Sequence, residues 1–327
     1  MAGKVRWGIL GTGWIADLQV KDLQMHGHAV TAVGSRSQAG ADAFAGRFGI
    51  GRAHGSYEAL CADPEVDAIY VATPHPMHHA NTLLALQNGK HALVEKAFTV
   101  NAHEAQELAD LAAAKGLVVL EAMWTRYLPH MVRIREIVRS GVLGEIRSVV
   151  ADHTQDLPDD PKHRLNALEL GGGALLDLGI YPISFTFDVL GKPQDIVARA
   201  RMKETGADGT VATLFTYASG AIASTISASD TAGRNVATIH GTEGRIEIDK
   251  VWYSPTSFRR YDAKNEVVED YRSEVKGRGM QYQAAELERL VAEDKTAGEI
   301  LSPTESVAIM ACMDEVRRQI GLKYPTE

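Results

Sequence analysis

The chain has 327 residues and a formal net charge of −8. That length predicts about two domains with sizeable cores, and the acidic balance argues against a surface that binds nucleic acid. Only two cysteines occur, Cys61 and Cys312, too few for a disulfide framework or a thiolate metal site. No signal-peptide pattern precedes the first strand, and no apolar run approaches the about 18 residues of a membrane span. We therefore expect a cytoplasmic protein with no membrane or nucleic-acid partner.

Short β-branched runs alternate with amphipathic helical stretches through the first third of the chain. This order predicts parallel strands joined by right-handed crossovers, and hence an α/β domain with a doubly wound parallel sheet over residues 1–122. Ligands of such sheets bind at the carboxyl ends of the strands. The expected strands are 5–10, 30–36, 66–73, 91–96 and 118–123, and the expected helices are 15–24, 39–48, 76–89 and 102–116.

The first expected strand ends in a glycine-rich turn. Its first glycine allows a tight turn, the second lets the backbone approach a pyrophosphate, and Ala16 in the third position still permits close packing of the helix. The N–H groups at the start of that helix then face the anion. Because this glycine pattern follows the first strand and precedes a helix, it predicts a dinucleotide-binding Rossmann domain. The alternative is an ordinary strand-to-helix turn that binds no nucleotide. The expected cofactor contacts are Gly11, Thr12, Gly13, Trp14 and Ile15.

The end of the second expected strand favours NADP over NAD. An NAD site usually carries an acidic residue there, which binds the ribose hydroxyls. This chain instead has Ser35, Arg36 and Ser37. The arginine can pair with a 2'-phosphate while the serine hydroxyls add hydrogen bonds. The alternative is a solvated loop arginine in a protein that uses NAD.

A histidine-containing turn follows the third expected strand, and His79 comes directly after it. Histidines at this spacing suggest a metal site, but no cysteine or convincing carboxylate partner lies beside them. We favour a turn that lines the cofactor, and we expect no metal. The cofactor-lining residues would be Thr73, Pro74, His75 and His78.

The next strand ends in Glu95 and Lys96. A lysine at the carboxyl end of a sheet strand lies at the rim where ligands bind. We therefore expect both residues beside the cofactor and Lys96 at the reacting groups as well, although a lysine at a strand end is more often simply solvated.

The apolar stretch 169–185 contains three successive glycines, then Asp177 and Tyr181. In a helix, residues four apart lie on one face, so the carboxylate and the phenol would project to a common point. Gly179 and Pro182 disfavour a regular helix and allow a kink. A structural alternative is that Asp177 interacts with the first helical turn while Tyr181 is a core aromatic.

Three further side chains are candidates for ligand binding. Trp124 and Arg126 follow the last sheet strand, where they would stack on the nicotinamide or clamp substrate oxygens, or else pack in a linker. Arg164 precedes the glycine run and is a weaker candidate for the substrate.

Taken together and in this order, the motifs resemble the glucose-fructose oxidoreductase/inositol dehydrogenase (Gfo/Idh/MocA) family. The resemblance spans nearly the whole chain. Many members have histidine where this chain has Tyr181. This tyrosine and the segment 121–129 make the chain similar to one branch of the family, that of dimeric dihydrodiol dehydrogenase, NADP-dependent xylose dehydrogenase and glucose-fructose oxidoreductase. The family usually has proline after the Glu-Lys pair, and Ala97 stands there in this chain.

The resemblance implies an NADP-dependent oxidoreductase that acts on an aldose or a related cyclic diol. Tyr181 would be the general base and acid, because an adjacent ammonium from Lys96 favours the phenolate and lowers the pKa of the phenol. Lys96 would also stabilise an alkoxide. Asp177, Arg126 and Arg164 would join them in binding the substrate. The alternative is a non-catalytic regulatory protein that senses NADP on the same scaffold.

Residues 123–327 are expected to form a second, α+β domain for substrate binding and oligomerisation. Long β-rich runs with turn signals predict a large, mainly antiparallel sheet with one open face. Because apolar residues on an open face have to be covered, and because the family pairs subunits through that sheet, we expect a homodimer or a higher oligomer. The expected strands lie within 146–155, 195–202, 210–229, 235–249 and 251–262, and the last helix is 302–321, capped by Ser302 or Thr304.

Overall fold

A computed structural model describes residues 4–325, which form two compact units. The first contains the described residues up to Trp124 together with Gly277–Val307, and the second contains Thr125–Lys276 and the residues from Ala308 onward. The sequence pattern placed Gly277–Val307 with the second domain. It packs in the first because α8 (Gln281–Ala292) buries Leu287 and Leu290 in the same core as Trp7.

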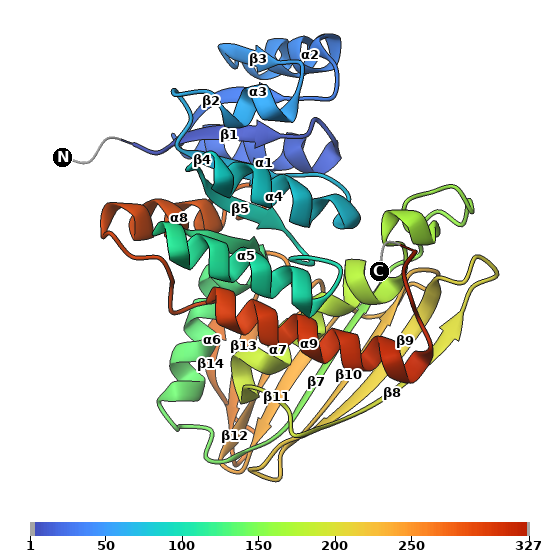
Figure 1. Cartoon of the computed structure of the whole chain (residues 1–327). Helices are drawn as coiled ribbons and strands as arrows, with labels where there is room; N and C mark the ends of the chain where they lie inside the picture. Colours follow the sequence, from blue (N-terminus) through green and yellow to red (C-terminus); the bar gives the residue numbers. More distant parts are fainter. Residues whose placement is uncertain (1–3, 326–327) are drawn as a thin grey trace. The chain divides into compact units, whose positions relative to one another are not determined.

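The first unit is built on a parallel sheet whose strand order is β3-β2-β1-β4-β5-β6 (Figure 1). This confirms the predicted α/β class with a doubly wound sheet, and it adds a short edge strand that the pattern did not indicate. The strands are β1 (Arg6–Leu10), β2 (Ala29–Gly34), β3 (Arg52–His54), β4 (Ala68–Val71), β5 (His91–Glu95) and β6 (Val119–Ala122).

The helices of the first unit follow the local end signals closely. Helix α5 starts after Asn101, whose Oδ1 accepts a hydrogen bond from the N–H of Glu104 at 2.9 Å, and it stops at Gly116, which is left-handed with φ 65°. The predicted helix 76–89 is divided into a short 3-10 turn, η1, and α4. The elements are α1 (Trp14–Met25), α2 (Gln38–Phe48), α3 (Tyr57–Cys61), η1 (His75–Met77), α4 (His78–Gln87) and α5 (Ala102–Lys115).

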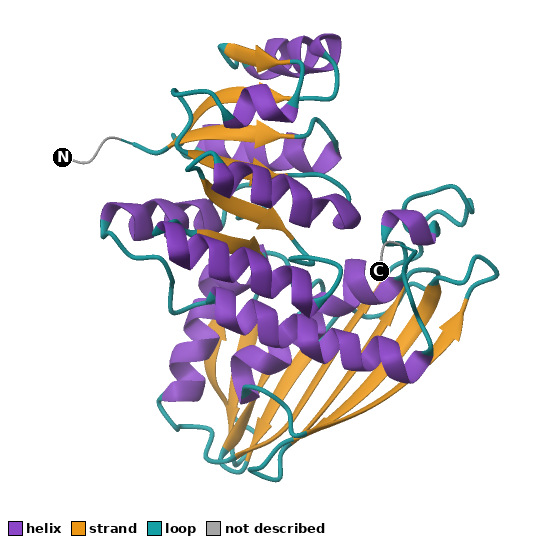
Figure 2. Cartoon of the chain, in the orientation of Figure 1, coloured by secondary structure: helices purple, strands orange, loops and turns teal. Residues whose placement is uncertain are grey.

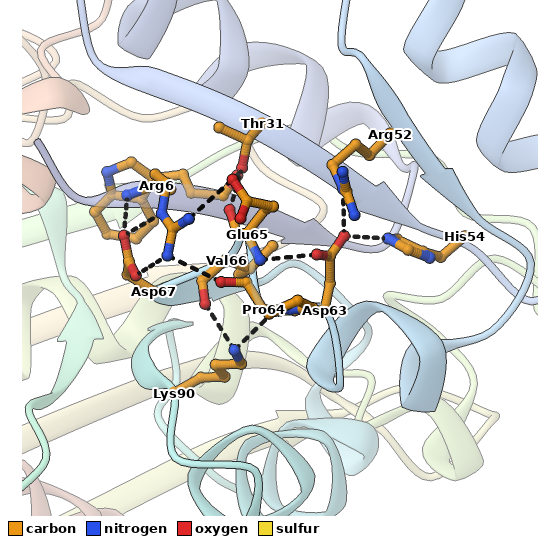
Figure 3. A network of polar contacts seen from close by, with 11 residues as sticks. Arg6, Thr31, Arg52, His54, Asp63, Pro64, Glu65, Val66, Asp67 and Lys90 are labelled. Carbon is orange, nitrogen blue, oxygen red and sulfur yellow. Dashed lines mark hydrogen bonds and ion pairs between the residues drawn. The ribbon is translucent and has the colours of Figure 1, made fainter.

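A polar network, drawn in Figure 3, includes residues at the start of β1 and in the loops before β4 and β5. Arg6, the first residue of β1, donates to both carboxylate oxygens of Asp67 at 2.8 and 2.7 Å. Asp63 is buried and accepts from Arg52 at 2.7 Å, while Lys90 donates to the carbonyl oxygens of Asp63 and Val66. These bonds tie the loop before β4 to the neighbouring strands and therefore stabilise the sheet at the end opposite to the ligand edge.

The second unit is built on a mainly antiparallel sheet of order β14-β13-β12-β11-β7-β10-β9-β8, as predicted. Within the described residues the exception is the pair of β7 and β10, which is parallel. Hairpins join β9 to β10 around Ser219 and Gly220, and β11 to β12 around Thr242 and Glu243, where the β-rich runs carry turn signals. The strands are β7 (Ile146–Thr154), β8 (Asp195–Met202), β9 (Asp208–Thr216), β10 (Ile222–Ala228), β11 (Ala237–Gly241), β12 (Gly244–Ile248), β13 (Phe258–Asp262) and β14 (Val267–Tyr271).

Helices lie on one face of this sheet, as Figure 2 shows. They are α6 (Pro129–Arg139), α7 (Ile180–Leu190) and the part of α9 (Pro303–Ile320) that belongs to the second unit. Helix α9 starts after Ser302, whose Oγ accepts from the N–H of Glu305 at 3.1 Å, so Ser302 is the cap. The opposite face exposes apolar side chains on four adjacent strands, namely Val150, Val197, Leu214, Ile222 and Ile226.

The segment before α7 is a π-helical turn, η4 (Leu175–Gly179), which continues directly into α7. The stretch Leu168–Leu190 has the length and mean hydropathy (1.3) of a membrane span, contrary to the expectation that no apolar run approaches that length. Its most apolar window is 83% buried within the protein, and a core helix passes the same test. Its apolar character is therefore explained by packing against the sheet.

Candidate active site

The glycine-rich turn has the backbone geometry that its sequence predicts. Gly11 has φ +108°, and a Cβ there would lie 3.0 Å from the carbonyl oxygen of Ala72 on the neighbouring strand end, so glycine is required. Gly13 is the residue before α1, is exposed, and a Cβ there would meet nothing within 4 Å among the described atoms. The first amides of α1 are therefore accessible from this side, which fits the approach of a pyrophosphate.

At the end of β2, Arg36 is exposed, and its positive charge reaches Tyr57. Burial raises the pKa of Tyr57, and the charge of Arg36 opposes that rise. Ser37 caps α2 by accepting from the N–H of Gly40 at 3.2 Å, and its hydroxyl proton stays available to donate to a ligand. Ser35 lies beside the glycine-rich turn, with its Oγ 3.5 Å from the Oγ1 of Thr12. This donor set, without a carboxylate at the strand end, fits a phosphorylated ribose better than free ribose hydroxyls.

The predicted histidine turn is tied to the end of β5 through its side chains. His75 Nε2 lies 3.2 Å from the carbonyl oxygen of Lys96. His78 is buried, with its ring nitrogens 2.9 and 2.8 Å from the carbonyl oxygens of Ala97 and Thr73. Burial lowers the pKa of His78 to about 4, so the ring is neutral near pH 7. In this geometry the two histidines fix the relative positions of two strand ends.

The third histidine of this segment points to another partner. His79 Nε2 lies 2.8 Å from a carboxylate oxygen of Glu107 on α5. Among the described residues, no group of three or more histidine, cysteine, aspartate or glutamate side chains is placed to hold a metal ion.

Lys96 follows directly after β5 and is half-buried. Its peptide bond to Ala97 is cis. Glu95 is buried one residue earlier, and its Oε1 accepts from the hydroxyl of Tyr70 on β4 at 2.5 Å. Because β2, β1, β4 and β5 are adjacent and parallel, their carboxyl ends bring Ser35, Gly11, Thr73 and Lys96 to one edge of the sheet.

In the second unit, Asp177 lies on the π-helical turn and Tyr181 is the second residue of α7. Both are 7% exposed. Asp177 Oδ1 accepts from Nη1 of Arg164 at 3.2 Å, so the structure brings two of the predicted substrate residues together. Arg164 itself is exposed, and this pair presents a carboxylate and a guanidinium side by side.

Tyr181 packs against an aromatic cluster that was not among the predicted site residues. The ring of His153 on β7 lies edge-on to Tyr181, with centroids 4.8 Å apart, and it stacks on Tyr253 at 3.7 Å. Gln155 Nε2 lies 2.8 Å from His153 Nε2 and 3.4 Å from the hydroxyl of Tyr253. The sequence carried a signal for this cluster, because Val149, Ala151 and His153 share the buried face of β7, and a histidine on such a face needs a polar partner.

Arg126 is buried and is bonded to α7. Its Nη1 donates to the carbonyl oxygen of Ser184 at 2.8 Å, and its Nε lies 3.3 Å from Asp188. Arg135 on α6 donates to the same carboxylate at 2.7 Å. The guanidinium therefore anchors the helix that carries Tyr181. The expected contact of Arg126 with the cofactor or the substrate stays a prediction.

Trp124, the other predicted residue of this junction, is also buried. The guanidinium of Arg278 lies 5.2 Å from the ring centroid of Trp124 and 5.8 Å from that of Trp14 at the start of α1. Arg278 comes from the segment that returns to the first unit, so nothing in its local sequence pointed to this position.

Comparison with known proteins agrees with these features. Residues 5–123 match the oxidoreductase family with an NAD-binding Rossmann fold, and residues 131–247 match the GFO/IDH/MocA C-terminal domain. D-xylose 1-dehydrogenase (NADP(+)) of Hypocrea jecorina is 35% identical over 98% of this chain and 93% of its own length. Trans-1,2-dihydrobenzene-1,2-diol dehydrogenase of Mus musculus is 34% identical over 99% of both chains.

A solved structure of similar fold is that of a 3-ketoreductase from Actinomadura kijaniata in complex with NADP and TDP-benzene. It superposes with a TM-score of 0.86 and 27% identity over 97% of this chain and 98% of that chain. The family models cover both halves of the chain and the relatives align over nearly all of it. This protein therefore belongs to the Gfo/Idh/MocA family of oxidoreductases, as its motifs predicted.

Proposed function

We propose that this oxidoreductase uses NADP to transfer a hydride to or from a carbon of an aldose or a related cyclic diol. The observation that carries the proposal is the single sheet edge that gathers the glycine-rich turn, the Ser35-Arg36-Ser37 segment and Lys96 from adjacent strand ends. The names of the relatives, an NADP-dependent xylose dehydrogenase and a dihydrodiol dehydrogenase, support the cofactor and the substrate class.

In this proposal the first unit holds the cofactor. The amides at the start of α1 bind the pyrophosphate, and Arg36 pairs with the 2'-phosphate, aided by the hydroxyls of Ser35 and Ser37. Bound NADP supplies a nicotinamide ring that accepts or gives a hydride. His75 and His78 act indirectly, since their side chains hold the strand ends that line the site. The remaining proposed cofactor contacts are Thr12, Trp14, Ile15, Thr73, Pro74, Glu95 and Trp124.

The second unit supplies the substrate and proton groups. Tyr181 takes a proton from the substrate hydroxyl during oxidation and returns it to the carbonyl oxygen during reduction. Lys96 provides the positive charge that favours the phenolate and stabilises a developing alkoxide. Asp177 and its partner Arg164 orient the other hydroxyls of the substrate, because a carboxylate accepts and a guanidinium donates hydrogen bonds.

The test is an activity measurement with purified protein, NADP or NAD, and a panel of pentoses, hexoses and trans-dihydrodiols, followed by the absorbance of the reduced nicotinamide. Turnover of at least one class with NADP is expected. Silence across the panel with tight binding of NADP would instead favour a regulatory protein that senses the nucleotide.

Tyr181→Phe tests the proton-transfer role. Loss of a general acid and base should lower kcat by roughly 100- to 10,000-fold, while the dissociation constant of NADP, measured by fluorescence quenching, stays unchanged. Tyr217→Phe is the matched control, because Tyr217 is another buried tyrosine of the second unit that the proposal leaves without a role. Equal turnover of the Tyr181→Phe variant and the wild type would exclude the mechanism.

We also propose that the open face of the second sheet pairs two or more copies of the chain. Its exposed apolar side chains on β7, β8, β9 and β10 form a contiguous surface that a soluble monomer rarely leaves in water. Leu214→Glu combined with Ile226→Glu should shift the sedimentation coefficient to that of a monomer. Val142→Glu, at an exposed valine outside this face, should not. A monomeric wild type would contradict this part of the proposal.

A cytoplasmic location completes the proposal. Cys61 and Cys312 are both buried and free in the described part of the chain. Burial raises the pKa of each thiol to about 12, so neither is reactive near pH 7. Mass spectrometry of the protein purified without reductant should find both thiols reduced.

A further inference from the structure

A buried carboxylate lies at the start of the helical segment that carries Asp177 and Tyr181. Asp208, the first residue of β9, is 0% exposed. Its Oδ2 accepts from the backbone N–H of Leu175, the first residue of the π-helical turn, at 2.6 Å. Ala174, at the N-cap position, has no oxygen in its side chain with which to cap the turn. The cap is therefore supplied by a strand that is distant in sequence.

Gly173 is explained by this arrangement, whereas Gly172 is explained by close packing against the preceding loop. A Cβ at Gly173 would overlap Oδ1 of Asp208, and Gly173 has φ +133°, which other residues rarely adopt. A Cβ at Gly172 would lie 2.8 Å from the carbonyl oxygen of Ala167. Gly173 thus lets the backbone come close enough for the carboxylate to reach the first turn.

We propose that Asp208 is a positioning residue for the reaction, which fixes the start of the segment that carries Asp177 and Tyr181. The inference rests on the proposed function, because those two side chains are the ones assigned to the substrate. An acceptor oxygen at a helix start satisfies an N–H that would otherwise be unpaired.

The same helical segment is held at a second point. Nη1 of Arg126 donates to the carbonyl oxygen of Ser184, nine residues after Leu175. Tyr181 lies between the two anchors. Because a helix is stiff over this length, bonds at both ends determine where the phenol and the carboxylate of Asp177 lie. Removal of one anchor should misplace both groups while leaving the other unit of the protein unchanged.

Asp208→Ala and Asp208→Asn form the first test. The alanine variant loses the acceptor, so kcat should fall by roughly 10- to 100-fold, with the dissociation constant of NADP unchanged. Hydrogen exchange measured by mass spectrometry should accelerate in the peptide that covers 174–181. Asparagine keeps an acceptor oxygen, so it should restore most of the activity and protection.

Gly173→Ala supplies an independent variant that leaves the carboxylate in place, in case Asp208→Ala does not fold. The added methyl group should displace the carboxylate and give the same loss of kcat and of exchange protection. Gly46→Ala, where a Cβ meets nothing within 4 Å among the described atoms, is its control and should behave as wild type.

Each outcome has a defined meaning. Wild-type kcat and wild-type exchange in Asp208→Ala would overturn the inference. So would an asparagine variant as inactive as alanine but with normal exchange protection, since charge and not capping would then matter. If the wild type turns over no sugar or diol, the proposed function fails, yet the exchange of residues 174–181 still tests whether Asp208 holds the segment.

Discussion

Arg126→Ala distinguishes an anchor of α7 from a ligand-binding arginine. The residue is 2% exposed, and its bond to the carbonyl oxygen of Ser184 is a charge-assisted hydrogen bond worth about 1.5–3 kcal/mol. Asp188 keeps Arg135 as a partner at 2.7 Å, so the variant does not leave this carboxylate unpaired. The substitution also removes the packing of the aliphatic part of the Arg126 side chain. We therefore expect the free energy of unfolding of the second unit to fall by about 3 kcal/mol in total.

The assay is thermal unfolding followed by circular dichroism, combined with a titration of NADP. A loss of about 3 kcal/mol corresponds to a fall in Tm of about 6–12 °C for a unit of this size. Arg133→Ala is the matched control, because Arg133 lies on α6 and makes exposed ion pairs with Glu136 and Glu269, which are worth at most about 1 kcal/mol.

The opposite pattern of stability and binding would show that Arg126 is a ligand-binding residue. If Arg126→Ala unfolds at the temperature of Arg133→Ala but binds NADP at least about tenfold more weakly, the guanidinium contacts the ligand and does not serve mainly as an anchor. An unchanged dissociation constant with a lower Tm supports the anchoring role.

Two further predictions concern the first unit. Arg36→Ala should lower the preference for NADP over NAD in kcat/KM by roughly 10- to 100-fold, since one charge-assisted contact with the 2'-phosphate is lost; an unchanged ratio would make Arg36 a solvated loop residue. Burial opposes ionisation of Asp63, but hydrogen bonds from Arg52, the N–H of Glu65 and His54 outweigh it and lower its pKa from 3.8 to about 2. The ionised carboxylate therefore stabilises the unit above pH 3.8, and about 2 kcal/mol is lost as the pH falls through 2. Asp63→Asn should remove this pH dependence in urea unfolding, whereas the same substitution at the exposed Asp110 should not.

Local signals were sufficient for five of the six strands, for the longer helices up to Lys115, and for the sheet edge of the first unit, but not for β3, α3 or α8. The alternation of strand and helix, the caps at Asn101 and Ser302 and the positive φ of Gly11 all depend on neighbouring residues, so they can be read along the chain. The order of parallel strands then places Lys96 and the glycine-rich turn at one edge. The sequence alone therefore predicted the family and the fold class.

Contacts between distant segments determined the rest. The capping of Leu175 by Asp208, the bond from Arg126 to α7, and the packing of His153 on Tyr253 join residues that no periodicity connects. Gly277–Val307 packs in the first unit through the apolar face of α8. The residue types on that face do not tell which of the two cores they join. An apolar pattern predicts that a helix or strand face is buried, but it does not identify the residues that pack against that face. Only the tertiary structure shows which distant side chains cover it.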